Sequence, residues 1–218
     1  MQCIALLALQ PGDVVLDVGC GTGASFEPLL AAVGRHGRVI AFEQSPRCTR
    51  RPRTAARAAR LREAGWHIDL QCASAEVVRF EPLLDAALFH YVHDITCTPH
   101  ALGNLLPQLP VGARLSVAVM KLFPWWLAPL NLLAWLKNRP YNVHAHQMNR
   151  PWSLLEQRLL GFNWTPTQSG MGYVKSGTVA ASRLCNPLII CLRPRMCQLR
   201  WHGTTRRFDM PLWPLPRR

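Results

Sequence analysis

The sequence predicts an α/β fold, a doubly wound and mostly parallel sheet of seven strands with helices on both faces. Short apolar, β-branched segments alternate with helical segments along the chain, and turns rich in Gly and Pro separate them. The 218 residues are enough for one such domain with a full core. With 49% hydrophobic and 17% charged residues, a wholly disordered chain is excluded.

The expected strands are short apolar segments bounded by turns. The first, 14–18, is the run VVLDV, and a turn with Pro11 and Gly12 precedes it. A similar turn from Pro110 to Gly112 precedes the fifth. In chain order, the expected strands are 14–18, 38–42, 68–72, 85–89, 114–119, 163–167 and 173–180.

The expected helices lie between these strands. Residues 24–33 follow the first strand, and 47–64 form an Ala- and Arg-rich helix that ends before Gly65. Residues 99–106 begin with a proline, which is favoured in the first turn of a helix. A fourth helix is expected over 151–160, before the last two strands.

Two segments interrupt this alternation. The domain is expected over 1–181, with an apolar cap insertion at about 121–151. Within it, 122–136 (LFPWWLAPLNLLAWL) is too short to span a bilayer, which needs about 20 apolar residues. It is expected to form a lid over an apolar substrate pocket or to touch a membrane surface weakly. The basic tail 182–218, rich in Pro, Arg and Cys, is expected to be poorly ordered.

The formal net charge of +13 is concentrated in two places. Residues 47–62 contain seven arginines and no acid, and 182–218 contain eight arginines and one acid. The rest of the chain is nearly neutral. A nucleic-acid partner is therefore possible but not favoured over compositional drift.

The eight cysteines are scattered and form no C-x-x-C pair, so no metal site is expected. The apolar run 3–9 is short and no basic residues precede it, so it does not resemble a signal peptide. Free thiols and a reducing, cytoplasmic location are the expectation.

The most informative motif joins the first strand to the first helix. It reads VVLDVGCGTG over 14–23, with Asp17 at the strand end, where a buried acid needs hydrogen-bond donors such as the N–H groups of the turn. Glu43 follows the second strand, where nucleotide-binding α/β folds place a carboxylate for the ribose hydroxyls. Since Gly23 comes one residue early for G-x-G-x-x-G, the turn suits a ligand without a pyrophosphate.

This motif resembles motif I of the class I S-adenosylmethionine-dependent methyltransferases, and the similarity extends from about Leu9 to Val179. The resemblance implies a Rossmann-like fold whose glycines lie under the methionine and ribose parts of S-adenosylmethionine. It implies that Asp17 faces the methionine amino group, that Glu43 binds the ribose and that Ser74, where the family usually has Asp or Asn, meets the adenine. The implied cofactor-binding residues are Asp17, Gly19, Cys20, Gly21, Thr22, Gly23, Glu43, Gln44, Ser74, Ala75, Glu76 and His90.

The segment after the fourth strand is the expected place for the acceptor chemistry. Ligands of open α/β sheets bind outside the carboxyl ends of the strands, and here His90 and His93 follow such an end. Either histidine could remove a proton from a hydroxyl or amine. The alternative is that His90 packs beside the cofactor and His93 lies exposed, because a sulfonium needs only an aligned acceptor.

Three functions remain open at this point. The first is transfer of a methyl group from S-adenosylmethionine to a small, apolar or aromatic molecule. The second is an RNA methyltransferase or nucleic-acid binder that uses the arginines of 47–62. Because only ten residues precede Pro11, the third is a truncated relative that keeps the fold without catalysis.

Overall fold

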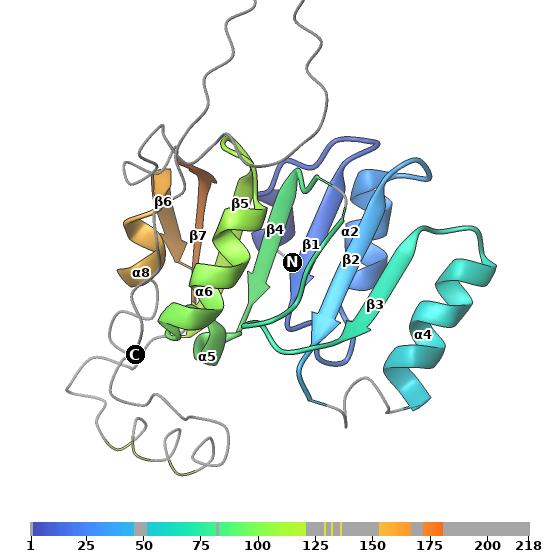
Figure 1. Cartoon of the computed structure of the whole chain (residues 1–218), viewed down its shortest axis with the longest axis horizontal. Helices are drawn as coiled ribbons and strands as arrows, with labels where there is room; N and C mark the ends of the chain where they lie inside the picture. The colour runs from blue at the N-terminus through green and yellow to red at the C-terminus, as the bar shows by residue number, and fades with distance from the viewer. Residues whose placement is uncertain are drawn as a thin grey trace, which may run out of the picture. The chain divides into compact units, whose positions relative to one another are not determined.

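A computed structural model describes residues 2–45, 52–81, 83–120, 153–166 and 172–180, together with Pro129, Leu132 and Leu136. Its seven-stranded sheet has the order β3-β2-β1-β4-β5-β7-β6 (Figure 1). Strands β1 to β5 are parallel to one another, and β7 is antiparallel to both β5 and β6. The predicted doubly wound fold is therefore confirmed. The strands are β1 (Val14–Val18), β2 (Arg38–Glu43), β3 (Ile68–Cys72), β4 (Ala86–His90), β5 (Arg114–Met120), β6 (Leu159–Pro166) and β7 (Gly172–Val179).

Helices cover both faces of the sheet, with α6 in front and α2 behind in Figure 1. In the parallel part, every crossover returns the chain to the same end of the sheet. The described helices are α1 (Gln2–Ala5), α2 (Phe26–Val33), α4 (Pro52–Glu63), α5 (His93–Thr96), α6 (Pro99–Leu105), the 3₁₀ helix η1 (Leu106–Gln108) and α8 (Ser153–Glu156).

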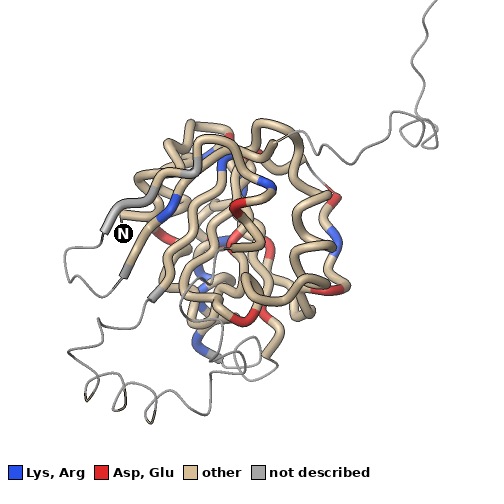
Figure 2. Tube along the Cα trace, turned by 90° about the vertical axis from the view of Figure 1, so that its left-hand side faces the viewer, with Lys and Arg blue, Asp and Glu red and all other residues tan. Residues whose placement is uncertain are grey.

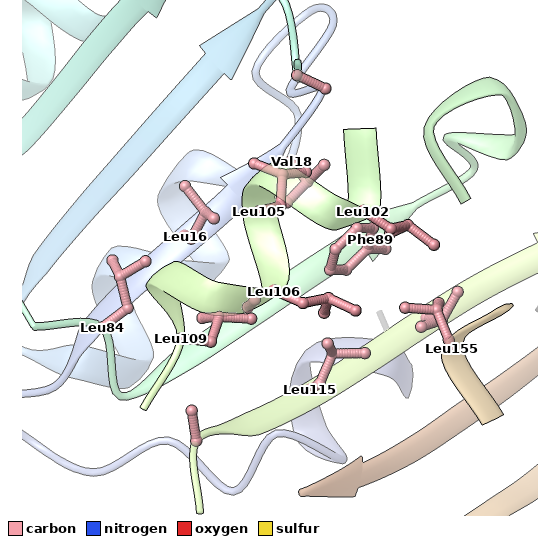
Figure 3. Packing of buried hydrophobic residues seen from close by; sticks show 14 of the residues in the cluster. Leu16, Val18, Leu84, Phe89, Leu102, Leu105, Leu106, Leu109, Leu115 and Leu155 are labelled. Atoms are coloured by element: carbon pink, nitrogen blue, oxygen red, sulfur yellow. The ribbon is translucent and has the colours of Figure 1, made fainter. Parts of the chain in front are cut away.

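The core consists of two apolar clusters, one on each face of the sheet. On one face, Leu105 and Leu106 pack with Leu16, Phe89 and Leu115 (Figure 3). Alternate residues of the same strands, such as Val15 and Val39, pack on the other face with Phe26, Leu29 and Leu30 of α2. Each fully buried leucine contributes about 1.5–3 kcal/mol. The two faces together fix the strands in register.

That register aligns the carboxyl ends of β1, β2, β3 and β4. Val18 of β1 lies opposite both Phe42 and Phe89. Glu43, the last residue of β2, lies opposite Cys72, the last residue of β3. The segments that follow these strands therefore leave the sheet at one edge, where ligands of such folds bind.

One predicted helix is wrong. The structure replaces the expected helix 151–160 by the short α8, and Leu159 and Leu160 already belong to β6. Leu159 pairs with Val179 of β7, and Gly161 has a φ of 61° at an irregularity in this pairing. A short run of leucines fits either period, so the neighbouring strand decides its conformation.

Two short helices were not predicted from the sequence. One is α1, which was expected only as part of an apolar run and whose residues Cys3 and Ile4 are buried. The other is α5, in the segment expected as a loop after the fourth strand.

The expected cap insertion and tail fall largely outside the described residues. Of 121–151 the structure describes only Pro129, Leu132 and Leu136, all in helical conformation, and of 182–218 it describes nothing. Residues 46–51, the start of the expected Arg-rich helix, are also outside it. Among the helices that are described, none is long and apolar enough to cross a membrane.

Candidate cofactor site

The glycine turn between β1 and α2 requires its three glycines for different reasons. All three have positive φ, with 62° at Gly19, 53° at Gly21 and 70° at Gly23. A Cβ on Gly19 would lie 2.6 Å from Cγ1 of Val92, and one on Gly23 would meet the Phe26 ring. By contrast, no heavy atom of the described residues lies within 4 Å of a Cβ on Gly21, its chain neighbours aside. Gly19 and Gly23 therefore permit packing, whereas Gly21 leaves bare main chain facing open space.

Asp17 is a buried carboxylate at the end of β1, with 1% of its surface exposed. Its Oδ2 accepts a hydrogen bond from the Ser25 hydroxyl. The sequence suggested N–H donors of the turn, but the donor in the structure is this side chain, one residue before α2. Burial and the negative charge of Glu43, opposed by the hydrogen bond from Ser25, together raise the pKa of Asp17 to about 6, and burial is the largest of these causes. A cation beside Asp17 would offset the cost of burying its negative charge.

Glu43 is tied to the glycine turn from the end of β2. Its Oε2 accepts a hydrogen bond of 3.0 Å from the backbone N–H of Gly21, and its Oε1 accepts one of 2.9 Å from that of Ser45. The Thr54 hydroxyl of α4 donates to the Gly21 carbonyl at 3.3 Å. Each carboxylate oxygen can still accept a further hydrogen bond, such as one from a sugar hydroxyl.

The loop after β3 is held by two side chains that the sequence analysis missed. Ser74 is half-buried, and its carbonyl accepts hydrogen bonds from the N–H groups of Val77 and Val78, at 3.2 and 3.0 Å. From α6, the Asn104 side-chain amide donates to the carbonyls of Ala75 and Val78, at 2.9 and 3.0 Å. From η1, Gln108 donates to the same Val78 carbonyl at 3.1 Å.

The support that these side chains give to the loop cannot be predicted from local sequence, because Asn104 is 29 residues from Ala75. The amides fix the position of the Ser74–Glu76 turn relative to the sheet. The carbonyls of Ala75 and Val78 thereby gain hydrogen-bond donors outside any helix or strand.

The segment after β4 lies directly against the glycine turn. A Cβ on Gly19 would collide with the Val92 side chain. It would also lie 3.5 Å from Cδ1 of Ile95 in α5. His90, the last residue of β4, is half-buried, and burial lowers its pKa. His93 is the first residue of α5, and its carbonyl accepts hydrogen bonds from the Thr96 hydroxyl and the Cys97 N–H.

These elements identify the fold family when they are compared with known proteins. A family model described as "Methyltransferase domain" matches residues 15–108, which span the glycine turn, Glu43, the Ser74 loop and the segment after β4. Over these residues, the chain belongs to the methyltransferase domain family. A comparison with curated protein sequences gave no match.

Solved structures of methyltransferases share this fold at low sequence identity. An S-adenosylmethionine-dependent methyltransferase from Aquifex aeolicus is 14% identical with a TM-score of 0.57, covering 82% of this chain and 88% of that one. The N-methyltransferase NodS from Bradyrhizobium japonicum, in complex with S-adenosyl-L-homocysteine, is 17% identical with a TM-score of 0.57 over 83% and 85%. A putative rRNA methylase from Clostridium thermocellum is 16% identical with a TM-score of 0.54 over 83% and 94%.

The residues at this edge of the sheet fit S-adenosylmethionine, the cofactor named for the solved structure from Aquifex aeolicus. Gly21 offers open main chain, Asp17 offers a buried negative charge for an ammonium group, and Glu43 offers carboxylate lone pairs for hydroxyls. Among the described residues, no cluster of His, Cys, Asp and Glu could hold a metal ion.

The remaining predicted contact residues differ in exposure. Cys20 is buried, and its N–H donates to the Phe42 carbonyl at 3.0 Å, which ties the turn to β2. Thr22, Gln44 and Glu76 are exposed, and Ala75 is buried.

Proposed function

We propose that the methyltransferase moves the methyl group of S-adenosylmethionine to a small, apolar or aromatic acceptor. The observation that carries this proposal is an uncharged aromatic pair beside the glycine turn. The rings of His90 and Tyr91 lie 4.7 Å apart, centroid to centroid, at the end of β4. Tyr91 has 47% of its surface exposed. A planar or apolar acceptor can pack on such a surface.

In this proposal, each cofactor group has its own partner. Asp17 pairs with the methionine ammonium, Glu43 accepts hydrogen bonds from the ribose hydroxyls and the Ser74 hydroxyl bonds to the adenine. Gly21 lets the cofactor lie against the turn. The bound cofactor supplies a methyl group already activated by its sulfonium charge, so the protein's main task is alignment of the acceptor.

His90 is proposed as the general base. The burial that lowers its pKa keeps the imidazole neutral at pH 7, so a ring nitrogen can accept the proton of a hydroxyl or amine acceptor. His93, one residue beyond Val92, is the second candidate for this role.

We also propose limits for the domain and a location for the enzyme. We assign the catalytic domain to 1–181 and treat 182–218 as a separate tail. We place the enzyme in the cytoplasm, which the thiols of Cys3 and Cys72 support, because among the described residues neither forms a disulfide.

The described part of the basic segment does not favour a nucleic-acid substrate. Arg57 of α4 is paired with Glu27, with Nε and Oε1 2.7 Å apart. In Figure 2, basic and acidic residues are interleaved and do not gather into one basic face of that view.

An acceptor screen tests the proposed substrate class. The full chain is incubated with methyl-labelled S-adenosylmethionine and, separately, with catechol, indole, an aromatic amine and total RNA. We expect label on at least one of the small acceptors and none on RNA. Label on RNA alone, lost at high salt, would contradict the proposal.

His90→Gln is expected to lower the rate of methyl transfer about 100-fold, because general-base catalysis contributes about 10²–10⁴-fold. The affinity for S-adenosylhomocysteine should change by less than about twofold, because glutamine is polar and of similar size. The measurements are single-turnover transfer to the acceptor found above and calorimetric titration. His67→Gln is the matched control, since exposed His67 precedes β3 at the opposite edge of the sheet. Transfer at the wild-type rate would eliminate His90 as the base.

A further inference from the structure

Tyr91 has a backbone conformation that long side chains rarely adopt. Its φ is 58°, in the left-handed region, and of the described non-glycine residues only Ala8 shares that sign. The conformation is held by a hydrogen bond of 2.9 Å from the Tyr91 N–H to the Ala118 carbonyl of β5. Strained residues of this kind persist where the surroundings determine them, and they are concentrated at functional sites.

The strained turn places the Tyr91 ring at the edge where the cofactor binds. The ring packs on His90 at an interplanar angle of 50° and remains half-exposed. The next residue, Val92, is in contact with the glycine turn at Gly19. Tyr91 is therefore the neighbour in sequence of a residue that contacts the turn. In the proposed function, this part of the turn supports the methionine end of the cofactor.

We propose that the Tyr91 ring contacts the sulfonium group of S-adenosylmethionine and makes the site prefer the methyl donor over its product. The face of an aromatic ring attracts cations, and the sulfonium carries a positive charge that the thioether of S-adenosylhomocysteine lacks. The neighbouring imidazole is neutral at pH 7 because burial lowers the pKa of His90, so it does not repel this charge. The inference rests on the proposed function. It adds a reason why the product, which lacks the positive charge, would be bound more weakly than the donor.

The test is calorimetric titration of the full chain with S-adenosylmethionine and with S-adenosylhomocysteine. Tyr91→Leu keeps an apolar side chain and the same backbone strain but removes the ring. We expect it to weaken S-adenosylmethionine binding about fivefold and S-adenosylhomocysteine binding less than about twofold. Tyr91→Phe, the matched control, keeps the ring and should leave both affinities unchanged.

Two further readouts separate a binding role from a structural one. Tyr91→Gly relieves the left-handed strain, so we expect a higher thermal unfolding midpoint together with the same loss of donor preference. Equal weakening of both compounds by Tyr91→Leu, or no change in either, would overturn the inference while leaving the cofactor site intact. Failure of the wild-type chain to bind either compound would instead overturn the proposed function.

Discussion

Gly21→Ala is expected to weaken binding of S-adenosylhomocysteine by about 30-fold or more, because the new methyl group occupies the space beside the turn where the cofactor lies. None of the described residues obstructs a Cβ at this position. The fold should therefore survive, with a backbone cost of about 1–2 kcal/mol for an alanine at a φ of 53°. Calorimetric titration and thermal unfolding measure the two effects.

Gly161→Ala is the matched control for that substitution. Gly161 of β6 has a φ of 61°, and a Cβ there would also meet no heavy atom within 4 Å. Its strain cost should equal that of Gly21→Ala, but it should leave affinity unchanged. If both variants lost affinity alike, the effect would come from backbone strain, and Gly21 would not contact the cofactor.

Asp17→Asn is expected to affect stability and affinity in ways that depend differently on pH. The folded-state pKa of Asp17 is raised from 3.8 to about 6, so the folded protein holds this proton more tightly than the unfolded chain. Wild-type stability contributed by this group is thus greatest below about pH 4 and is lost as the pH rises to about 6. Asparagine does not titrate, so the stability of the variant relative to wild type should rise over that range by up to about 3 kcal/mol.

The same substitution should weaken binding of S-adenosylmethionine about 10- to 100-fold at pH 7, because a charge-assisted bond to the ammonium group is lost. Denaturant unfolding from pH 4 to 8 and calorimetry at pH 7 provide the data. The Ser25 hydroxyl can still donate to the asparagine oxygen, so the local structure should persist. A stability difference that does not change with pH would show that Asp17 titrates normally, and unchanged affinity would remove it from the ammonium site.

The sequence was most informative where local patterns coincide with tertiary structure. The strands 14–18 and 68–72 were predicted with the bounds that the structure has, because 14–18 is mostly apolar and 68–72 alternates apolar with polar residues. The turn glycines and Glu43 could also be located, since their spacing after two strands is characteristic. The helix expected over 151–160 failed because the pairing of Leu159 with Val179 cannot be seen locally.

Other features of the site depend on residues far apart in the chain. The packing of Val92 on Gly19 and the support of the Ser74 loop by Asn104 arise only once the sheet brings these segments together. The choice of Ser25 as the donor to Asp17 depends on how α2 begins. The left-handed conformation of Tyr91 likewise has no sequence signature, because tyrosine is not a residue that favours it.

The most direct measurement is titration of the purified full chain with S-adenosylhomocysteine, followed by calorimetry, with circular dichroism to establish that the chain is folded. The account predicts binding of one molecule per chain with a dissociation constant of about 1–100 μM, weakened about 30-fold or more in Gly21→Ala. A chain that is folded but binds no S-adenosylhomocysteine would contradict the account and favour a relative that has kept the fold without the catalysis.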